Sequence, residues 1–131
     1  MNVLVVDSNL EIVERIKDLL VEQEDIQQVS GFVCYEEAIQ RFRMLKPAVM
    51  VVDTSLNSEH AFRLIQLAKN TSPATVIIAT SIYADAVSIN RIKEFGANFF
   101  LDKYLFSDNI TATLDHIKTS FQVLNPIYKN N

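Results

Sequence analysis

The stretch that most constrains the fold is residues 48–53, in which five apolar residues are followed by a single carboxylate, Asp53. A short, unbroken apolar run is typical of a strand that is buried on both faces of a parallel sheet. Pro47 stands directly before it, where a strand can begin but a helix cannot continue. Because burying an aspartate is costly, we expect Asp53 to open onto a ligand crevice at the strand end.

Strand-like and helix-like segments alternate along the whole chain. Four further strands are predicted at residues 3–6, 26–34, 75–80 and 98–102. The second of these is less apolar and contains Gly31, so we place it nearer the sheet edge. Apolar residues at helical spacing predict helices over 12–20, 35–46, 60–69, 84–95 and 107–124. The sequence therefore predicts an α/β fold, a doubly wound five-stranded parallel sheet with five helices.

Composition restricts the classes of function. With 131 residues the chain is expected to form one domain, and its net charge of -4 argues against nucleic-acid or anionic-membrane binding. Cys34, the one cysteine, excludes an internal disulfide and is expected to be a small buried hydrophobe. Gly31 and Gly96, the only glycines, are too few for a P-loop or a dinucleotide fingerprint. No leader or membrane-length apolar run is visible, so we expect a cytoplasmic protein.

Chemically active side chains follow four of the predicted strands, namely Asp7, Asp53, Thr80 and Lys103. The carboxyl ends of parallel strands meet at one edge of the sheet, where ligands bind. Two carboxylates at one edge repel each other and attract a cation, either Lys103 or a bound Mg²⁺. A carboxylate can also attack a phosphoryl group to form an aspartyl phosphate, while cations stabilise the charge on the phosphoryl oxygens.

Four fragments in order, VLVVDSN, KPAVMVVDTSL, VIIATS and GANFFLDK, resemble the response regulator receiver domain of bacterial two-component signalling. The resemblance, to a chemotaxis-type single-domain receiver, implies a flavodoxin-like domain over residues 1–124 with strand order 2-1-3-4-5. Residues 125–131 are expected to form a flexible C-terminal tail.

The resemblance implies a magnesium-dependent phosphorylation site. Asp53 resembles the phosphoacceptor, Asp7 one of the metal-binding acids, and Ser55 the residue whose backbone carbonyl completes the metal site. Ser8 stands where the family has a second acid. With two carboxylates in place of three, Mg²⁺ is expected to bind weakly.

The resemblance also implies the parts of a switch. Thr80 resembles the switch hydroxyl, Lys103 the invariant lysine and Phe100 the rotating aromatic of the family. Tyr104 follows the lysine where the family has proline, so no cis peptide is expected there. The loop at residues 54–57 lacks the family's Met-Pro.

The implied function is a phosphorylation-dependent signalling switch. A histidine kinase or phosphotransfer protein would phosphorylate Asp53. The face made by the fourth helix, fifth strand and fifth helix would then bind a downstream protein or a second copy. The apolar Ile82 cannot orient an attacking water, so a long-lived phosphoryl group is expected.

Two alternatives stay open. Ser8 favours a pseudo-receiver, which binds partners without being phosphorylated. A phosphohydrolase of similar chemistry would need an aspartate as general acid at position 55, where this chain has Ser55, so we do not expect an enzyme.

Overall fold

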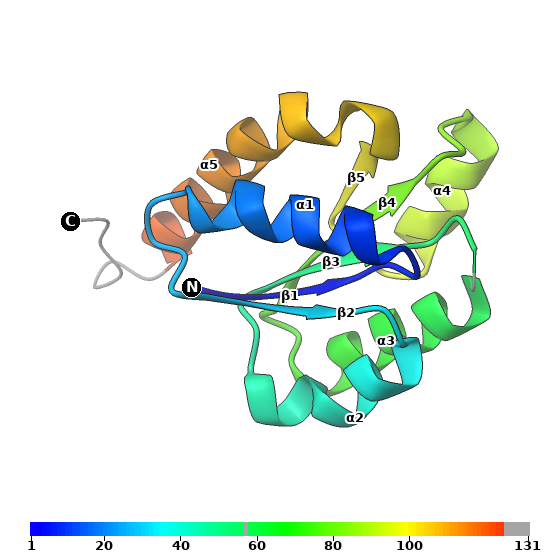
Figure 1. Ribbon diagram of the computed structural model, residues 1–131, viewed down its shortest axis with the longest axis horizontal. Coiled ribbons are helices and arrows are strands. Elements are labelled where there is room, and N and C mark those ends of the chain that lie inside the picture. The colour runs from blue at the N-terminus through cyan, green and yellow to red at the C-terminus, as the bar shows by residue number, and fades with distance from the viewer. Residues whose placement is uncertain (57, 125–131) are drawn as a thin grey trace.

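A computed structural model describes residues 1–56 and 58–124, with side chains as far as residue 120. It contains one five-stranded sheet with helices on both faces (Figure 1). The strand order is β2-β1-β3-β4-β5, and every neighbouring pair is parallel. The predicted doubly wound α/β fold and its strand order are therefore confirmed.

The elements lie close to the predicted ranges. The strands are β1 (Asn2–Val6), β2 (Gln28–Phe32), β3 (Val49–Asp53), β4 (Val76–Ser81) and β5 (Phe99–Asp102). The helices are α1 (Leu10–Val21), α2 (Tyr35–Leu45), α3 (Ser58–Thr71), α4 (Ala86–Glu94) and α5 (Phe106–Leu124), with a 3-10 turn at Lys103–Leu105. In the part of the chain that the structure describes, no helix has the length and apolar character needed to cross a bilayer. The predicted tail, residues 125–131, lies outside the described residues.

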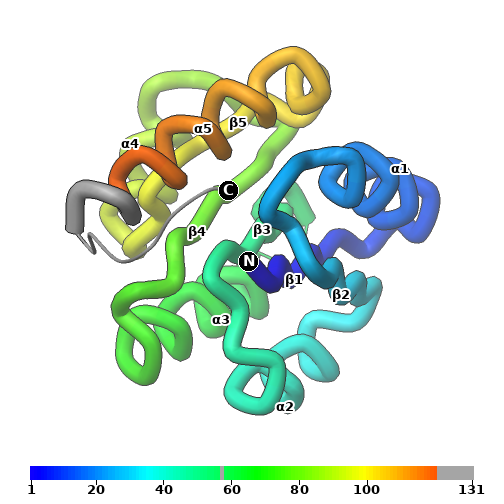
Figure 2. The backbone as a smooth tube through the Cα atoms, turned by 90° about the vertical axis from the view of Figure 1, so that its left-hand side faces the viewer, coloured from blue at the N-terminus to red at the C-terminus, as the bar shows by residue number. Residues whose placement is uncertain are grey.

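The sheet separates two hydrophobic clusters, because successive side chains of a strand point to opposite faces. In Figure 1, α1 and α5 lie on one side of the sheet, and α2 and α3 lie on the other. Alternate residues of β1 follow this division, since Leu4 packs toward α2 and α3 whereas Val5 packs toward α1 and α5. Phe99 and Phe100 of β5 likewise pack against different clusters. Figure 2 shows the same layers from the side.

Local sequence features explain how the elements begin and end. Asn9 is the N-cap of α1, and its side chain accepts hydrogen bonds from two amides of the first turn. Lys46, in the left-handed conformation, ends α2 directly before Pro47. Gly96 follows α4 with a φ of 120°, a conformation that favours glycine. These three caps lie where the chain has left β1 and where it approaches β3 and β5.

The expected burial of Cys34 is wrong, because its side chain is exposed. Cys34 is the N-cap of α2, where the chain leaves the sheet edge. The next residue, Tyr35, turns inward instead and is buried in the cluster beneath α2 and α3. Apolar character alone did not distinguish the two neighbours, and the helix start decided which of them entered the core.

Candidate functional site

The four strand-end residues identified from the sequence come together at one edge of the sheet. Asp53 is in register with Thr80 of the neighbouring strand, and the Thr80 hydroxyl donates to Asp53 Oδ1 at 3.4 Å. The ammonium of Lys103 lies 2.8 Å from Asp7 Oδ2 and 3.5 Å from Asp53 Oδ1. Lys103 therefore bridges the two carboxylates.

The hydroxyl of Ser55 makes contacts that the sequence analysis missed. It donates to Asp53 Oδ1 at 2.9 Å and accepts from the backbone N–H of Ile82 at 2.9 Å. The sequence signal was the presence of a hydroxyl two residues after a carboxylate, within reach of it. Ser55 thus connects the Asp53 carboxylate to the loop that follows β4.

Both carboxylates are removed from solvent, with Asp7 and Asp53 each 1% exposed. Burial raises the pKa of Asp53, the charge of Asp7 raises it further, and Lys103 and Ser55 oppose the shift. For Lys103, burial alone would lower the pKa, but contacts with Asp7 and Asp53 hold it above its ordinary value. The site therefore holds more negative charge than its lysine compensates.

One buried carboxylate oxygen of this site lacks a hydrogen-bond partner. Asp53 Oδ2 has no hydrogen-bond partner among the described residues, and Asp7 Oδ2 has only its ion-pair contact with Lys103. Buried polar atoms are normally satisfied, so an unpartnered carboxylate oxygen points to a bound cation or to a nucleophilic role.

The residues at this edge suit a weakly held Mg²⁺. Outside residue 57 and the end of the chain, no group of three or more His, Cys, Asp or Glu side chains is placed to hold a metal. Asp7 and Asp53 supply two carboxylates, and Ser8, the residue in place of the second acid, is exposed. Mg²⁺ is often bound by one or two carboxylates together with substrate phosphates, so two carboxylates and the unpartnered Asp53 Oδ2 fit this ion.

Tyr35 is a second residue that sequence reasoning missed. Its hydroxyl donates to the backbone carbonyl oxygen of Asp53 at 2.7 Å, in a buried position. Burial raises the pKa of Tyr35, and the charges of Asp53 and Asp7 raise it further, so the hydroxyl keeps its proton. Nothing in the linear sequence connects the start of α2 with the end of β3.

Phe100 of β5 and Tyr104 after it differ in how far they are buried. Phe100 is half-buried and packs against the cluster on the α2–α3 side of the sheet. Tyr104 is 78% exposed, and no cis peptide bond occurs among the described residues, as expected for the Lys103–Tyr104 bond. Of the two histidines, His116 is exposed, and His60 is half-buried with its Nε2 3.3 Å from Glu36 Oε1.

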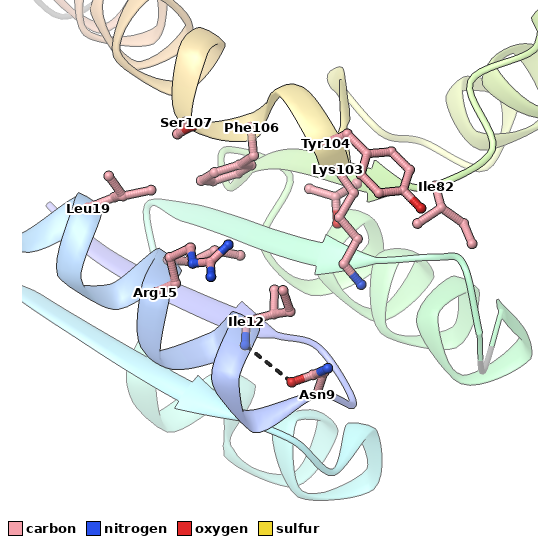
Figure 3. A pocket seen from close by; sticks show the side chains of 11 residues that line it. Asn9, Ile12, Arg15, Leu19, Ile82, Lys103, Tyr104, Phe106 and Ser107 are labelled. Atoms are coloured by element: carbon pink, nitrogen blue, oxygen red, sulfur yellow. Dashed lines mark hydrogen bonds between the residues drawn. The ribbon is translucent and has the colours of Figure 1, made fainter.

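A groove of about 360 Å³ opens beside Lys103 (Figure 3). In Figure 3 the side chains of Ile12 and Arg15 extend from α1 on one side of the groove, and those of Tyr104 and Phe106 lie on the other. Thr80 and Ile82 complete the end nearest the strand termini. The surface next to the lysine is therefore mainly apolar and has one arginine.

The family model for the response regulator receiver domain matches residues 3–115. The chain belongs to this family. Among curated proteins, the DNA-binding transcriptional activator EvgA of Escherichia coli K12 is 23% identical over 121 residues, covering 92% of this chain and 59% of EvgA. The chain thus spans less than two thirds of that relative.

Solved receiver domains share the fold. The isolated receiver domain of RcsB from Salmonella enterica serovar Typhimurium, in the apo form, superposes with a TM-score of 0.81 at 18% identity, covering 92% of this chain and 89% of that one. The response regulator domain of Thermotoga maritima CheB gives a TM-score of 0.72 at 23% identity, covering 91% and 94%. The receiver family inferred from the four sequence fragments is confirmed.

Proposed function

We propose that this receiver domain is a cytoplasmic, phosphorylation-dependent switch that accepts a phosphoryl group on Asp53. The donor is the phosphohistidine of a kinase or phosphotransfer protein. The observation that carries the proposal is the buried Asp53 carboxylate, with Oδ2 unpartnered and Lys103 and Thr80 beside Oδ1. A carboxylate placed in this way is a nucleophile with its charge stabilisers already assembled.

In the transfer step, a carboxylate oxygen of Asp53 attacks phosphorus. An O–P bond forms as the P–N bond of the phosphohistidine breaks, and the imidazole leaves with the electron pair and takes up a proton from solvent. The Lys103 ammonium supplies positive charge at the phosphoryl oxygens. Asp7, Asp53 and the backbone carbonyl of Ser55 would hold Mg²⁺, which, when bound, neutralises charge on those oxygens. The protein assists its own modification and is not an enzyme for an external substrate.

Thr80 and Phe100 would convert phosphorylation into a change of surface. The Thr80 hydroxyl now contacts Asp53 Oδ1 at the long distance of 3.4 Å, so a phosphoryl oxygen nearby offers a better acceptor. Movement of Thr80 leaves space for Phe100, which is half-buried on the adjacent strand. The altered face of α4, β5 and α5 then binds a downstream protein or a second copy of the domain.

The groove beside Lys103 supports a protein donor. Its apolar lining from α1 and from the start of α5 fits the side of a partner helix, and Arg15 fits an acidic residue on that helix. A phosphohistidine on such a helix would be brought next to the strand ends. The groove therefore supports a phosphotransfer partner rather than a small phosphodonor alone.

A pseudo-receiver is the alternative that one observation favours. Lys103 already neutralises Asp7 at 2.8 Å, and exposed Ser8 adds no carboxylate for a metal. In that case the fold would bind partners in a single state.

Peptide mapping tests the proposal. The protein is incubated with acetyl phosphate and Mg²⁺, trapped with borohydride, digested and analysed by mass spectrometry, with D53N as the matched control. We expect modification at Asp53 in the wild-type protein and none in the variant. An unmodified wild-type protein, or modification at another residue, contradicts the proposed function and favours the pseudo-receiver.

A further inference from the structure

The peptide unit that joins Asp53 to Thr54 is held from both sides. On one side its carbonyl oxygen accepts a hydrogen bond from the Tyr35 hydroxyl at 2.7 Å. On the other side its N–H donates to the carbonyl oxygen of Thr80 at 2.8 Å, and the Thr54 hydroxyl donates to the same oxygen at 3.0 Å. A single peptide therefore connects the start of α2 with the switch position on β4.

The sheet itself leaves room for the tyrosine. The register between β1 and β3 ends at the Val6–Val52 pair, one residue before Asp53. The carbonyl of Asp53 is buried, and a buried carbonyl needs a donor. Tyr35, the first residue of α2 and only 4% exposed, donates the hydrogen bond that this carbonyl needs.

We infer that Tyr35 is a positioning residue for phosphorylation, acting through the main chain of Asp53. This inference rests on the proposed function and extends it to α2. Its hydroxyl fixes the 53–54 peptide, and that peptide fixes where the Asp53 carboxylate and the Thr80 backbone lie relative to each other. The contacts that matter are long, 3.5 Å from the Lys103 ammonium and 3.4 Å from the Thr80 hydroxyl to Asp53 Oδ1. A small movement of the peptide is enough to lose them.

The effect of losing the hydroxyl follows from this geometry. In Y35F the ring still fills the core, but the Asp53 carbonyl has lost its donor and moves toward another one. Misplacing a reacting group by about 1 Å costs roughly 100-fold in rate, and the retained strand limits the shift, so we expect phosphorylation about tenfold slower.

The experiment measures the rate of phosphoryl uptake from acetyl phosphate with Mg²⁺ by intact mass in wild-type protein, Y35F and F42L. Phe42 is 1% exposed and lies in the same helix and cluster, and its ring carries no hydrogen-bonding group, so F42L loses packing without removing a hydrogen bond from the site. Unfolding by urea shows how far each variant is destabilised. Proton–nitrogen correlation spectra follow the Thr54 amide, whose peptide carbonyl loses its donor in Y35F.

We expect slow uptake and a shifted Thr54 amide in Y35F, with near wild-type values of both in F42L. Equal slowing in Y35F and F42L at equal loss of stability would overturn the inference, because stability alone would then explain the rate. Wild-type uptake in Y35F would also overturn it. If the wild-type protein takes up no phosphoryl group, the proposed function fails, while the Thr54 amide still tests whether Tyr35 holds the peptide.

Discussion

Replacing Asp53 with asparagine is expected to stabilise the folded protein at neutral pH. Asn has nearly the same shape as Asp but no charge. It removes one of two buried carboxylates from a site with a single lysine in contact with both. The charged carboxylate of Asp53 is thus expected to lower the free energy of unfolding.

The magnitude follows from three opposing terms. The Lys103 ammonium contacts oxygens of Asp7 and Asp53 at 2.8 and 3.5 Å, so those oxygens lie within about 6 Å of each other and repel by about 3 kcal/mol at an effective dielectric constant near 20. On the same scale Lys103 attracts Asp53 by about 5 kcal/mol. Removing the Asp53 charge from water costs several kcal/mol, so the net change in D53N is a gain of about 1–3 kcal/mol in the free energy of unfolding.

The pH dependence of unfolding tests separately whether D53N stabilises the protein. Burial and Asp7 raise the pKa of Asp53 above its ordinary value of 3.8, so the folded state binds a proton more tightly than the unfolded state. As pH rises from 3.8 through the folded-state pKa, the wild-type protein loses stability that D53N does not lose. The advantage of D53N is therefore small near pH 4 and largest above the folded-state pKa.

Urea unfolding followed by circular dichroism, in EDTA at pH 4 and pH 7, measures this difference. D85N is the matched control, because Asp85 is an exposed N-cap of α4 whose pKa is lowered by hydrogen bonds from Ser88. We expect no gain at pH 7 in D85N. A D53N protein that is no more stable than wild type at pH 7, or one whose advantage is larger at pH 4, would refute the reasoning.

Three further predictions test other parts of the site and fold. Replacing Lys103 with methionine leaves two buried carboxylates without the ammonium that contacts them, so we expect the free energy of unfolding in urea at pH 7 to fall by about 3–5 kcal/mol. The double mutant D53N/K103M should recover most of this stability, and strictly additive effects of the two substitutions would count against the explanation. Replacing Gly31 with alanine places a Cβ 2.6 Å from Val13 Cγ1, so we expect a loss of about 1–3 kcal/mol by thermal unfolding, and an unchanged Tm would show that α1 yields freely. In T80A, phosphoryl uptake should still be measurable by intact mass, but the shifts of the backbone amides around Phe100 that accompany it in proton–nitrogen correlation spectra should be lost. Amide shifts as large as those of the wild-type protein would exclude Thr80 as the switch.

The fold was predictable because its signals are local and repeated. Apolar runs such as residues 48–52 are typical of strands buried on both faces of a parallel sheet, and the amphipathic helices between them supply the covering layers. The meeting of Asp7, Asp53, Thr80 and Lys103 was predictable for a related reason, since parallel strands end at the same edge.

The remaining contacts depend on side-chain directions that a linear pattern does not contain. Tyr35 reaches Asp53 across the fold, and the Ser55 hydroxyl bridges two loops. The same limit explains the error at Cys34, where the start of α2 decided that the tyrosine, and not the cysteine, faces inward. Some predicted boundaries also differ from the observed ones. The helix α3 begins at Ser58 and not at residue 60, a difference of about half a turn.

The central claim is that two carboxylates suffice for magnesium-dependent phosphorylation of Asp53. The most direct measurement is the phosphorylated fraction, from intact mass, of wild-type protein and S8D across a Mg²⁺ titration with acetyl phosphate. We predict that the wild-type protein becomes phosphorylated at high Mg²⁺ and that S8D reaches the same fraction at lower Mg²⁺. A wild-type protein that remains unmodified at every Mg²⁺ concentration, while S8D is phosphorylated, would contradict the claim and identify the natural protein as a pseudo-receiver.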